Sequence, residues 1–572
     1  MHMKFRMKGH AAGALATVVL GAFGGPHTSP FYHPKLMAFL ATAAAAAGWL
    51  ALRSRIRVPS RGTLVLCGFF GLLAAILAIN APNPLPALVA VSVPAAGFFV
   101  YLALINLDQS DRETVLWWIL TAAVIQAVIA GLQYTRVLPC FDSFWDVRKA
   151  GAIGTVGNPE FLATLLGCSV FAAVRFIERS RNPRIIIGLT FGITVLLAGL
   201  VLTHNKGTLL FLFLYLVWRV PAPHAGRIAV IAAIPVILAI MLPHSFLDRV
   251  ILWIAAGKVF LDHPLVGIGP GQYGNYYLDA LDSLFSSHPA LASVFGTYSG
   301  DIRDPHNLIL GQGAELGIAG LVLAAIFSLY GLKTSIKAGG PLGAALLMLV
   351  VKCQYTVVVP SVTGAILLAV FVALSSKALP PSIRSPVWPK LLPLLSLALL
   401  LPAFRLATAD RAAHQGNRLL LLGDLAGAES RFQTALAANP REAEAHLSIA
   451  FMAFRRRQYP AMDRGIVDAL DCQRHVDIVK RAAHLYFFSH QYSLAEPIYE
   501  KLARIYPDRR SAFVKLAEIR RALGDPTGAR ILARRVIEMK PRIYNPFDAG
   551  YLSTARRILE LTSESVRKPN RP

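Results

Sequence analysis

The chain has 572 residues, of which 55% are hydrophobic and 16% are charged, and its mean hydropathy is +0.52. This composition excludes an ordinary soluble enzyme and indicates a polytopic membrane protein. The net charge of +25 does not indicate a nucleic-acid partner, because in the first two thirds of the chain the basic residues lie in short connections between apolar runs.

The apolar runs predict membrane-spanning helices. A helix that crosses ~30 Å of hydrocarbon needs roughly 17 to 25 apolar residues, so we expect about 12–13 spans in a helical bundle. The N-terminal MHMKFRMKGH runs on into further spans, so no cleavable signal peptide is predicted. The expected spans lie near residues 10–25, 35–52, 62–80, 84–106, 113–132, 159–177, 184–203, 206–219, 227–243, 307–331, 339–355, 359–375 and 389–404.

The basic connections predict the orientation of these spans. Lysines and arginines concentrate at the N-terminus and at alternate connections, which places those connections in the cytoplasm. The connections near 133–158 and 244–306 then face the periplasm, as does everything after residue 405. The basic connections are residues 4–8, 53–61, 179–184, 219–227, 333–337 and 377–384.

The first polar motif is GAIGTVGNPEFLATLL, residues 151–166. Asn158 followed by Pro159 is a sound start for a helix, since Asn caps N-terminal N–H groups and Pro suits the first turn. A structural role is therefore one interpretation of Asn158, and contact with a ligand is the other.

The second motif is THNKG, residues 203–207, before the short apolar run at 206–219. A lysine at a membrane boundary commonly extends its ammonium group to the interface. Lys206 lies immediately outside a predicted helical hairpin, so binding of an anionic ligand is the alternative.

The third motif is DRVILWIAAGKVFLDHPLVGIGPGQYGNYY, residues 248–277. It predicts an amphipathic helix with Arg249 and Trp253 one turn apart, followed by His263-Pro264 and a glycine-rich turn. We reject a dinucleotide site at G-x-G-x-G, because no strand precedes it and no phosphate-facing helix is indicated after it.

The fourth motif is DPHNLILGQGAELGIAG, residues 304–320. It places His306 where a membrane helix leaves water, which suits a general base, with Asp304 or Asn307 orienting the ring. The alternative is that Asn307 or Asp304 merely caps the helix. Glu315 lies inside the apolar run and is a functional candidate by position, although it could equally bond to a neighbouring helix.

Together, the four motifs resemble the O-antigen ligase family, which includes O-antigen polymerases and protein O-oligosaccharyltransferases. The matching strings are G-N-P-x-F-L-A, R-x-x-x-W, H-P-L-x-G-x-G-x-x-x-Y and H-N-x9-G-x-x-G, the last ending in Gly317 and Gly320. They follow the family's order over residues 150–330. The chain departs from the family at 205–207, where Asn205, Lys206 and Gly207 replace the usual serine, arginine and small residue.

The resemblance implies a GT-C-like, metal-independent, inverting glycosyltransferase that needs no cofactor. It moves a glycan from undecaprenyl diphosphate to a hydroxyl of lipid A core or another acceptor. His306 is then the base, Arg249 and Lys206 are the catalytic cations, and Arg303 and Asn158 also contact the donor. Because lysine lacks the planar fork of arginine, Lys206 would hold phosphate as a point charge. Arg303 adjoins Asp304, so an ion pair is its alternative role.

The motifs do not decide among a ligase, a polymerase and a protein O-oligosaccharyltransferase. A transporter of lipid-linked sugars is a hypothesis of another class. It would place ionisable residues near the bilayer midplane and often shows an internal repeat of spans, and neither pattern is apparent. No acidic metal-binding pair occurs in the predicted outer connections, and the five scattered cysteines predict neither a disulfide framework nor a zinc site.

After Pro402 the pattern changes to charged, soluble helices. Pro507 and Pro541 are 34 residues apart, the period of tetratricopeptide repeats, and Pro440 ends a similar segment. The small and aromatic positions recur before each proline, whereas residues 443–475 fit less well. About four repeats are expected, with about 28 Lys and Arg against about 18 Asp and Glu after residue 408. The positions that match the repeat are Gly416, Ala428, Phe432, Ala435, Ala495, Tyr499 and Ala529.

The predicted fold is therefore all-α. Residues 1–405 form a transmembrane glycosyltransferase domain of the bacterial inner membrane, with a large outer loop at 244–306. Residues 406–572 form a periplasmic α-solenoid of tetratricopeptide repeats. The expected partners are the lipid-linked donor, a lipid or protein acceptor, membrane lipids and a protein bound by the repeats.

Overall fold

The structure is a computed structural model that divides into two compact units, which are described separately. Unit 1 comprises Met1–Met241, Leu265–Gly271 and His306–His414, and unit 2 comprises Leu242–Pro264, Gln272–Pro305 and Gln415–Pro572. Residues 227–242 of one predicted span, and Arg303, lie outside the described residues. The described residues are 2–22, 32–53, 55–139, 146–219, 243–296, 304–356, 361–375, 382–384, 391–540 and 547–567.

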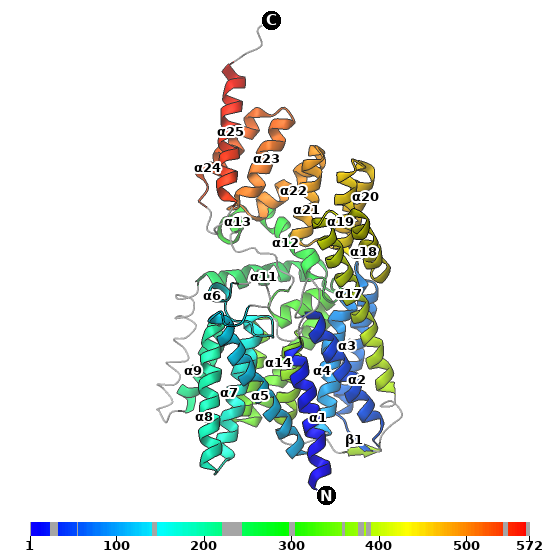
Figure 1. Cartoon of the computed structure of the whole chain (residues 1–572), viewed down its shortest axis with the longest axis vertical. Coiled ribbons are helices and arrows are strands. Elements are labelled where there is room, and N and C mark those ends of the chain that lie inside the picture. Colours follow the sequence, from blue (N-terminus) through cyan, green and yellow to red (C-terminus); the bar gives the residue numbers. More distant parts are fainter. Residues whose placement is uncertain are drawn as a thin grey trace. The chain divides into compact units, whose positions relative to one another are not determined.

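In the part of unit 1 that the structure describes, the elements are helices and one short strand pair (Figure 1). Its last helix, α17, continues beyond His414 into unit 2. The elements are α1 (His2–Gly21), α2 (Tyr32–Ala51), β1 (Arg55–Arg57), α3 (Arg61–Ile79), α4 (Pro84–Ile105), α5 (Gln109–Tyr134), α6 (Val147–Ala150), α7 (Pro159–Arg179), α8 (Pro183–Leu202), α9 (Lys206–Arg219), α14 (Leu308–Ala338), α15 (Gly340–Lys352), α16 (Val362–Ser375), β2 (Ser382–Arg384) and α17 (Leu392–Leu421).

Several of these helices could cross a membrane. Within the described residues, seven are long and apolar enough by length and composition: α2, α4, α5, α7, α8, α14 and α17. Shorter apolar helices cover Gly9–Gly21, Leu64–Ile79, Gly340–Lys352 and Val362–Ser375. Each overlaps a segment that the hydropathy pattern predicts as a span. The apolar composition and the helical structure thus agree with a membrane protein.

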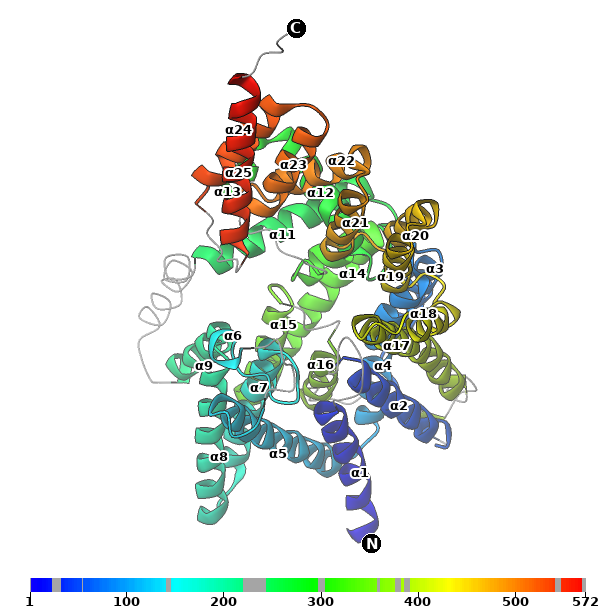
Figure 2. The ribbon, with the colours of Figure 1, turned by 45° about the horizontal axis from the view of Figure 1, so that its top comes forward.

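Helix α16 lies inside unit 1 and explains why its sequence is apolar on every side. All but one of its residues are buried, and it packs against α4, α15, α7 and α14 (Figure 2). A helix that is hydrophobic all round belongs in a core or in lipid. Here neighbouring helices cover it, so packing rather than lipid contact accounts for its composition.

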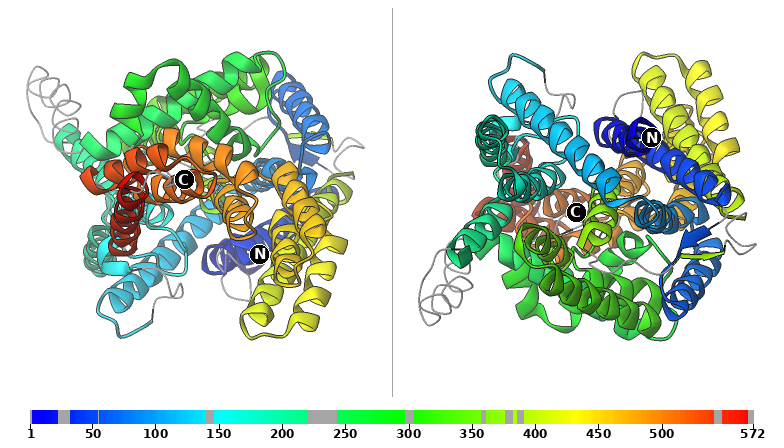
Figure 3. Two further views of the ribbon diagram at one scale, coloured as in Figure 1. Left: turned by 90° about the horizontal axis from the view of Figure 1, so that it is seen from above. Right: turned by 90° about the horizontal axis from the view of Figure 1, so that it is seen from below.

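The two short strands join two of the predicted cytoplasmic connections. β1 pairs antiparallel with β2, with Arg55 opposite Arg384. Arg53 donates a hydrogen bond to the Asn106 carbonyl oxygen at 2.9 Å, which brings a third connection to the same place. Figure 3 (right) views unit 1 from the end where the N-terminus lies. Residues 55–57 and 382–384, which belong to two of the predicted basic connections, therefore lie together.

Unit 2 contains paired helices in the C-terminal region together with three helices from the predicted outer loop (Figure 3, left). The loop helices α11, α12 and α13 thus belong with the repeats, whereas the sequence pattern predicts a boundary at residue 405 that assigns them to the spans. The elements are α11 (Pro243–Asp262), α12 (Tyr273–Ser287), α13 (Pro289–Phe295), α18 (Leu425–Ala438), α19 (Ala443–Arg455), α20 (Tyr459–Cys472), α21 (Val476–Phe488), α22 (Tyr492–Ile505), α23 (Arg510–Ala522), α24 (Pro526–Glu538) and α25 (Asp548–Arg567).

The small and aromatic repeat positions pack between paired helices. Phe432 is fully buried, and a Cβ on Gly416 would lie 2.5 Å from its ring. Residues 443–475, which fit the repeat less well, nevertheless form the pair α19 and α20, where a Cβ on Gly465 would lie 3.0 Å from the Ala450 Cβ. Close helix packing therefore explains the small residues at these positions.

Candidate functional site

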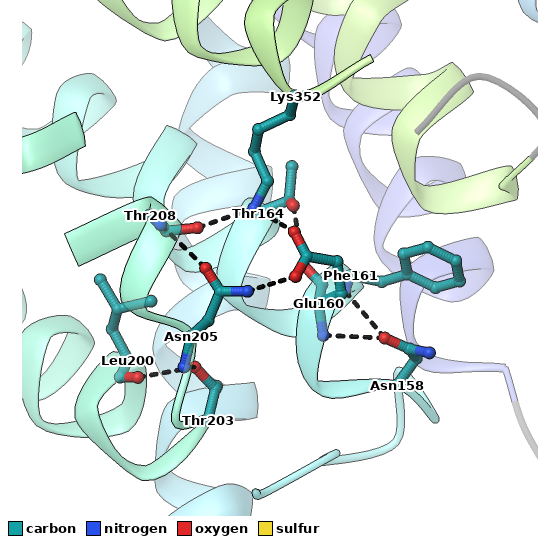
Figure 4. A network of polar contacts seen from close by, with 9 residues as sticks. All are labelled: Asn158, Glu160, Phe161, Thr164, Leu200, Thr203, Asn205, Thr208 and Lys352. Atoms are coloured by element: carbon teal, nitrogen blue, oxygen red, sulfur yellow. Dashed lines mark hydrogen bonds and ion pairs between the residues drawn. The ribbon is translucent and has the colours of Figure 1, made fainter. Parts of the chain in front are cut away.

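A buried lysine at the end of α15 is the centre of a polar network in unit 1. The Lys352 side chain has 0% exposure. Its Nζ lies 2.6 Å from Glu160 Oε1 and donates to Thr208 Oγ1 at 2.7 Å (Figure 4). A buried ammonium group is costly unless it is paired and hydrogen-bonded. Lys352 therefore ties the first turns of α7 and α9 to the end of α15.

Asparagines cap the two helices that Lys352 joins. Asn158 Oδ1 accepts the Glu160 N–H at 2.8 Å at the start of α7, so the predicted capping role of Asn158 is confirmed. Asn205 Oδ1 accepts the Thr208 N–H at 2.8 Å at the start of α9. Asn205 Nδ2 also donates to Glu160 Oε2 (Figure 4). The Glu160 carboxylate consequently bridges a lysine and a cap asparagine.

A third helix start is bonded to the residues that follow Lys352. Asn307 Oδ1 caps α14 by accepting the Leu310 N–H at 2.9 Å, and Asn307 Nδ2 donates to the Gln354 carbonyl oxygen at 3.0 Å. The Leu308 N–H donates to the Cys353 carbonyl oxygen at 2.8 Å. The capping interpretation of Asn307 is therefore also confirmed.

We call Asn158, Asn205, Lys206, Asn307 and Lys352 the helix-start cluster. It joins the N-terminal ends of α7, α9 and α14 to the end of α15. Each helix N-terminus carries a partial positive charge, which favours an anion. Lys206, the first residue of α9, is exposed, and no ion pair links it to another residue in the described part of the chain. The cluster thus combines three helix starts with an accessible cation.

The segment before Asn158 is held by polar side chains from two apolar helices. Lys35 donates to the Thr155 carbonyl oxygen at 2.5 Å, and Gln126 Nε2 donates to Thr155 Oγ1 at 2.7 Å. Gly151 has φ +93, and a Cβ there would lie 2.4 Å from the Thr203 carbonyl oxygen. The 151–158 motif therefore needs glycine for close backbone approach. Sequence reasoning missed Lys35, Gln126, Glu160 and Lys352, although each is a polar residue at or within a predicted span.

His306 directly precedes the α14 cap and has a left-handed backbone. It is partly buried and has φ 55. Positive φ is uncommon for residues other than glycine and often marks functional sites. Asp304 is assigned to unit 2, so its predicted role in orienting the His306 ring stays a prediction.

The paired glycines of the H-N-x9-G-x-x-G motif shape a break in α14. Gly317 has φ 64 and ψ −153, outside the helical range. A Cβ on Gly320 would lie 2.1 Å from the Gln312 carbonyl oxygen. Gly317 and Gly320 are therefore required by the backbone itself, which permits a sharp bend in this helix.

The glycine-rich turn of the third motif fills this break. The Ile268 and Gly269 N–H groups donate to the carbonyl oxygens of Ala314 and Glu315 at 3.1 and 2.9 Å. A Cβ on Gly267 would lie 2.4 Å from the Glu315 carbonyl carbon. The turn therefore supplies N–H groups to carbonyl oxygens at the break. Glu315 is partly buried, and the role of its carboxylate stays a prediction.

Arg249 and Trp253 lie one turn apart on α11 and are both partly buried. They belong to unit 2, whereas His306 and Lys206 belong to unit 1. The predicted convergence of Arg249 with His306 and Lys206 therefore stays a prediction. The described residues contain no group of three or more His, Cys, Asp or Glu side chains arranged to hold a metal ion.

The neighbouring tyrosines of unit 2 form a buried pair. Tyr273 Oη donates to the Leu252 carbonyl oxygen at 3.0 Å, which joins α12 to α11. Burial raises the pKa of Tyr273 well above its usual value, and Tyr277 and Asp304 add to the effect. Tyr273 is thus a neutral hydrogen-bond donor that fixes the helix carrying Arg249.

The comparisons with known proteins concern the C-terminal region. The tetratricopeptide repeat pattern matches residues 414–461 and 480–542. The chain is similar to a solved structure described as "Functional Characterization of Pseudomonas Aeruginosa pilF", at 13% identity and a TM-score of 0.22, over 31% of this chain and 82% of that one. It is also similar to "Crystal structure of APC/C hetero-tetramer Cut9-Hcn1", at 12% identity and a TM-score of 0.23, over 91% and 84%.

Both TM-scores are too low to indicate a shared overall fold. None of the curated proteins compared with the chain matches it. The match to the repeat pattern instead agrees with the helix pairs between α18 and α24 and with the packing of Gly416 on Phe432. The C-terminal region of this chain therefore carries tetratricopeptide repeats.

Proposed function

We propose that the protein transfers a glycan from a polyprenyl diphosphate, of the undecaprenyl type, to an acceptor hydroxyl at the periplasmic face of the bacterial inner membrane. The observation that carries this proposal is the helix-start cluster, in which the N-terminal ends of three helices are bonded to the end of α15 and the exposed Lys206 begins one of them. A diphosphate is the leaving group in such a reaction, and its growing negative charge requires fixed donors and cations. The sequence resemblance supports the same reaction.

The proposed chemistry is a single displacement with inversion. The acceptor oxygen forms a bond to the anomeric carbon, and the bond from that carbon to the diphosphate oxygen breaks. The electron pair of the broken bond leaves with the diphosphate, and the hydroxyl proton passes to the imidazole of His306. Lys206 and Arg249 then stabilise the departing diphosphate.

Lys352 and Glu160 have a different part in this proposal. Lys352 is buried and paired, so it positions other groups and is not itself the diphosphate contact. Through Glu160 and Asn205 it fixes the first turn of α9, and Lys206 is the first residue of that helix. The acceptor remains open among lipid A core, a growing lipid-linked glycan and a protein hydroxyl, because the motifs are common to all three enzymes.

Transport of a lipid-linked sugar is the second candidate function. The observation that favours it is the buried Lys352–Glu160 ion pair, since ionisable pairs within membrane helices commonly serve coupled transport. The starts of α7 and α9 contact this pair, however, and the start of α14 is bonded to the two residues that follow Lys352. Such a group of helix starts is also what an anion site at the end of a helical bundle requires. Transfer is therefore the proposal, and transport is an outcome of its test.

The test uses purified full-length protein in lipid vesicles with a polyprenyl-diphosphate glycan and candidate acceptors. Wild type should form the glycosylated acceptor and release the polyprenyl diphosphate. His306→Ala should lower the rate by about 10²–10⁴. Lys206→Ala should lower it by about 10²–10³, the usual effect of removing a group that stabilises transition-state charge.

Lys337→Ala is the matched control, because Lys337 is an exposed lysine in the last turn of α14. It should transfer at the wild-type rate. If the wild type moves the lipid-linked glycan across the bilayer without transferring it, transport replaces transfer as the function. Full activity of Lys206→Ala would remove Lys206 from the mechanism.

A further inference from the structure

Unit 2 contains a contact between the repeats and α12 that is rich in charges of opposite sign. Asp279 and Asp282 of α12 face Lys501 and Arg504 of α22, and Arg474 lies between α20 and α21. The aspartates are one turn apart on their helix, as are Lys501 and Arg504 on theirs. Two helices from distant parts of the sequence thus present complementary charge.

The pairs form two neighbouring groups, one around Asp279 and one around Asp282. Lys501 Nζ and Asp279 Oδ1 form an ion pair, and Arg474 Nη1 lies 3.5 Å from Asp279 Oδ2. Arg504 holds Asp282 through two hydrogen bonds, with Nε at 2.8 Å and Nη2 at 3.3 Å. Networks and two-point arginine contacts contribute more than isolated surface pairs. The backbone N–H of Arg474 also donates to Asn275 Oδ1 at 3.2 Å.

Apolar burial accompanies the charges. Tyr277, Leu281 and Phe285 of α12 are almost fully buried and recur every four residues, so they form one face of the helix. Beyond α12, Gly296 follows α13 and approaches Pro507, where a Cβ would lie 2.4 Å from Pro507 Cδ. The contact therefore extends from the middle of α12 past the end of α13.

A second contact joins α12 to α11, the helix that carries Arg249. Tyr273 Oη donates to the Leu252 carbonyl oxygen, and the His263 and Tyr276 rings meet edge to face with centroids 5.6 Å apart. Arg249 lies one turn before Leu252 on α11. The repeats thus hold α12, and α12 holds α11.

We infer that α12 is a ligand of the repeats within the same chain, and that the basic surface formed by Arg474, Lys501 and Arg504 holds the α11–α13 segment in place. The repeats then act as a clamp on part of the transfer site, in addition to any separate protein they bind. The consequence for transfer, that the clamp positions Arg249, rests on the proposed function. The clamp itself does not.

Zero-length cross-linking with a carbodiimide tests the contact in the full chain. The reagent condenses an amine with a carboxylate in direct contact, so wild type should give a peptide in which Lys501 is joined to Asp279. Lys258 and Asp262, an ion pair within α11, provide the internal positive control. Lys501→Arg keeps the charge but removes the amine, so it should lose the 501–279 product and keep the 258–262 product.

A charge swap tests the consequence for transfer. The double variant Asp279→Lys/Asp282→Lys should transfer about tenfold more slowly, because three ion pairs each worth a fraction of a kcal/mol are lost. Adding Lys501→Asp and Arg504→Asp should restore most of the rate. Rescue distinguishes a lost contact from misfolding of α12.

The outcomes separate this inference from the proposed function. If the 258–262 product forms and the 501–279 product does not, the clamp is overturned. If the 501–279 product forms but the wild type transfers no glycan, the proposed function fails while the clamp stands. If the Asp279→Lys/Asp282→Lys variant transfers at the wild-type rate, the clamp does not position Arg249.

Discussion

At the scale of single residues, Lys352 shows how a bundle of apolar helices accommodates a buried charge. Its ammonium group has a carboxylate at 2.6 Å and a hydroxyl at 2.7 Å, which replace water. Removing one partner of a buried pair leaves the other uncompensated, whereas removing both can be nearly neutral. The pair is therefore expected to behave as a unit.

Lys352→Met should lower the free energy of unfolding by about 3–5 kcal/mol, because it leaves Glu160 partly buried without its cation. The double variant Lys352→Met/Glu160→Gln should recover at least half of that loss. Denaturant unfolding in detergent measures both. A single variant as stable as wild type would show that Glu160 does not depend on Lys352.

His306 combines a predicted chemical role with a left-handed backbone. His306→Gly suits φ 55 and should not destabilise the fold, but it should lower transfer by about 10²–10⁴ because the base is lost. Added imidazole should restore part of the rate in this variant. His306→Asn, which also tolerates positive φ, is the control that imidazole should not rescue, since its side chain occupies the site.

His484 predicts a pH dependence in the repeats. Burial lowers its pKa, and the charges of Lys515 and Lys480 lower it further. The unfolded state therefore binds a proton more readily than the folded state, so stability is complete above the ordinary pKa of about 6.5 and is lost as the pH falls below it. Hydrogen exchange of α21, corrected for intrinsic rates, should show this loss. His484→Gln should show less of it.

At the scale of elements, the break in α14 depends on glycine. Gly320→Ala should destabilise the protein by more than about 2 kcal/mol, because its Cβ would lie 2.1 Å from the Gln312 carbonyl oxygen. Gly188→Ala in α8 is the matched control, since nothing lies within 4 Å of its Cβ and a helical alanine is favoured by about 0.5–1 kcal/mol. Thermal unfolding in detergent compares the two. Equal stability of both variants would refute the steric argument.

Helix starts are also where sequence and structure agree most closely. The Asn-Pro pair at 158–159 and the His-Asn pair at 306–307 each begin a helix where the capping pattern predicts. Capping is local, because the side chain bonds to N–H groups two or three residues ahead. The contacts that join these helix starts to the end of α15 link residues far apart in the sequence, so the capping pattern does not predict them.

At the scale of the whole molecule, both units are discontinuous along the sequence. Residues 242–264 and 272–305 belong to unit 2, and residues 265–271 between them belong to unit 1. The sequence pattern predicts one boundary near residue 405, because composition changes there. Composition reports how apolar a segment is, whereas a unit is defined by which segments pack together.

Truncation after residue 408 distinguishes the clamp from a repeat domain that only recruits an acceptor. Because α12 would lose its partners on α22, we expect the truncated protein to lose transfer to every acceptor, and its 263–296 segment to become sensitive to protease. Transfer assays and limited proteolysis in vesicles measure these effects. Selective loss of one acceptor, with unchanged protease resistance, would favour recruitment alone.

The sequence by itself determined the features that depend on neighbouring residues. These are the apolar helices, the asparagine caps at 158 and 307, the 34-residue period and the basic connections, since hydropathy, capping and charge act along a few turns of chain. Only the tertiary structure decided that Lys352 pairs with Glu160, that the glycine turn at 267–269 fills the break at Gly317, and that α12 attaches to the repeats. Each of these contacts joins residues from about 50 to more than 200 positions apart, and selecting them among all possible partners requires the packed fold.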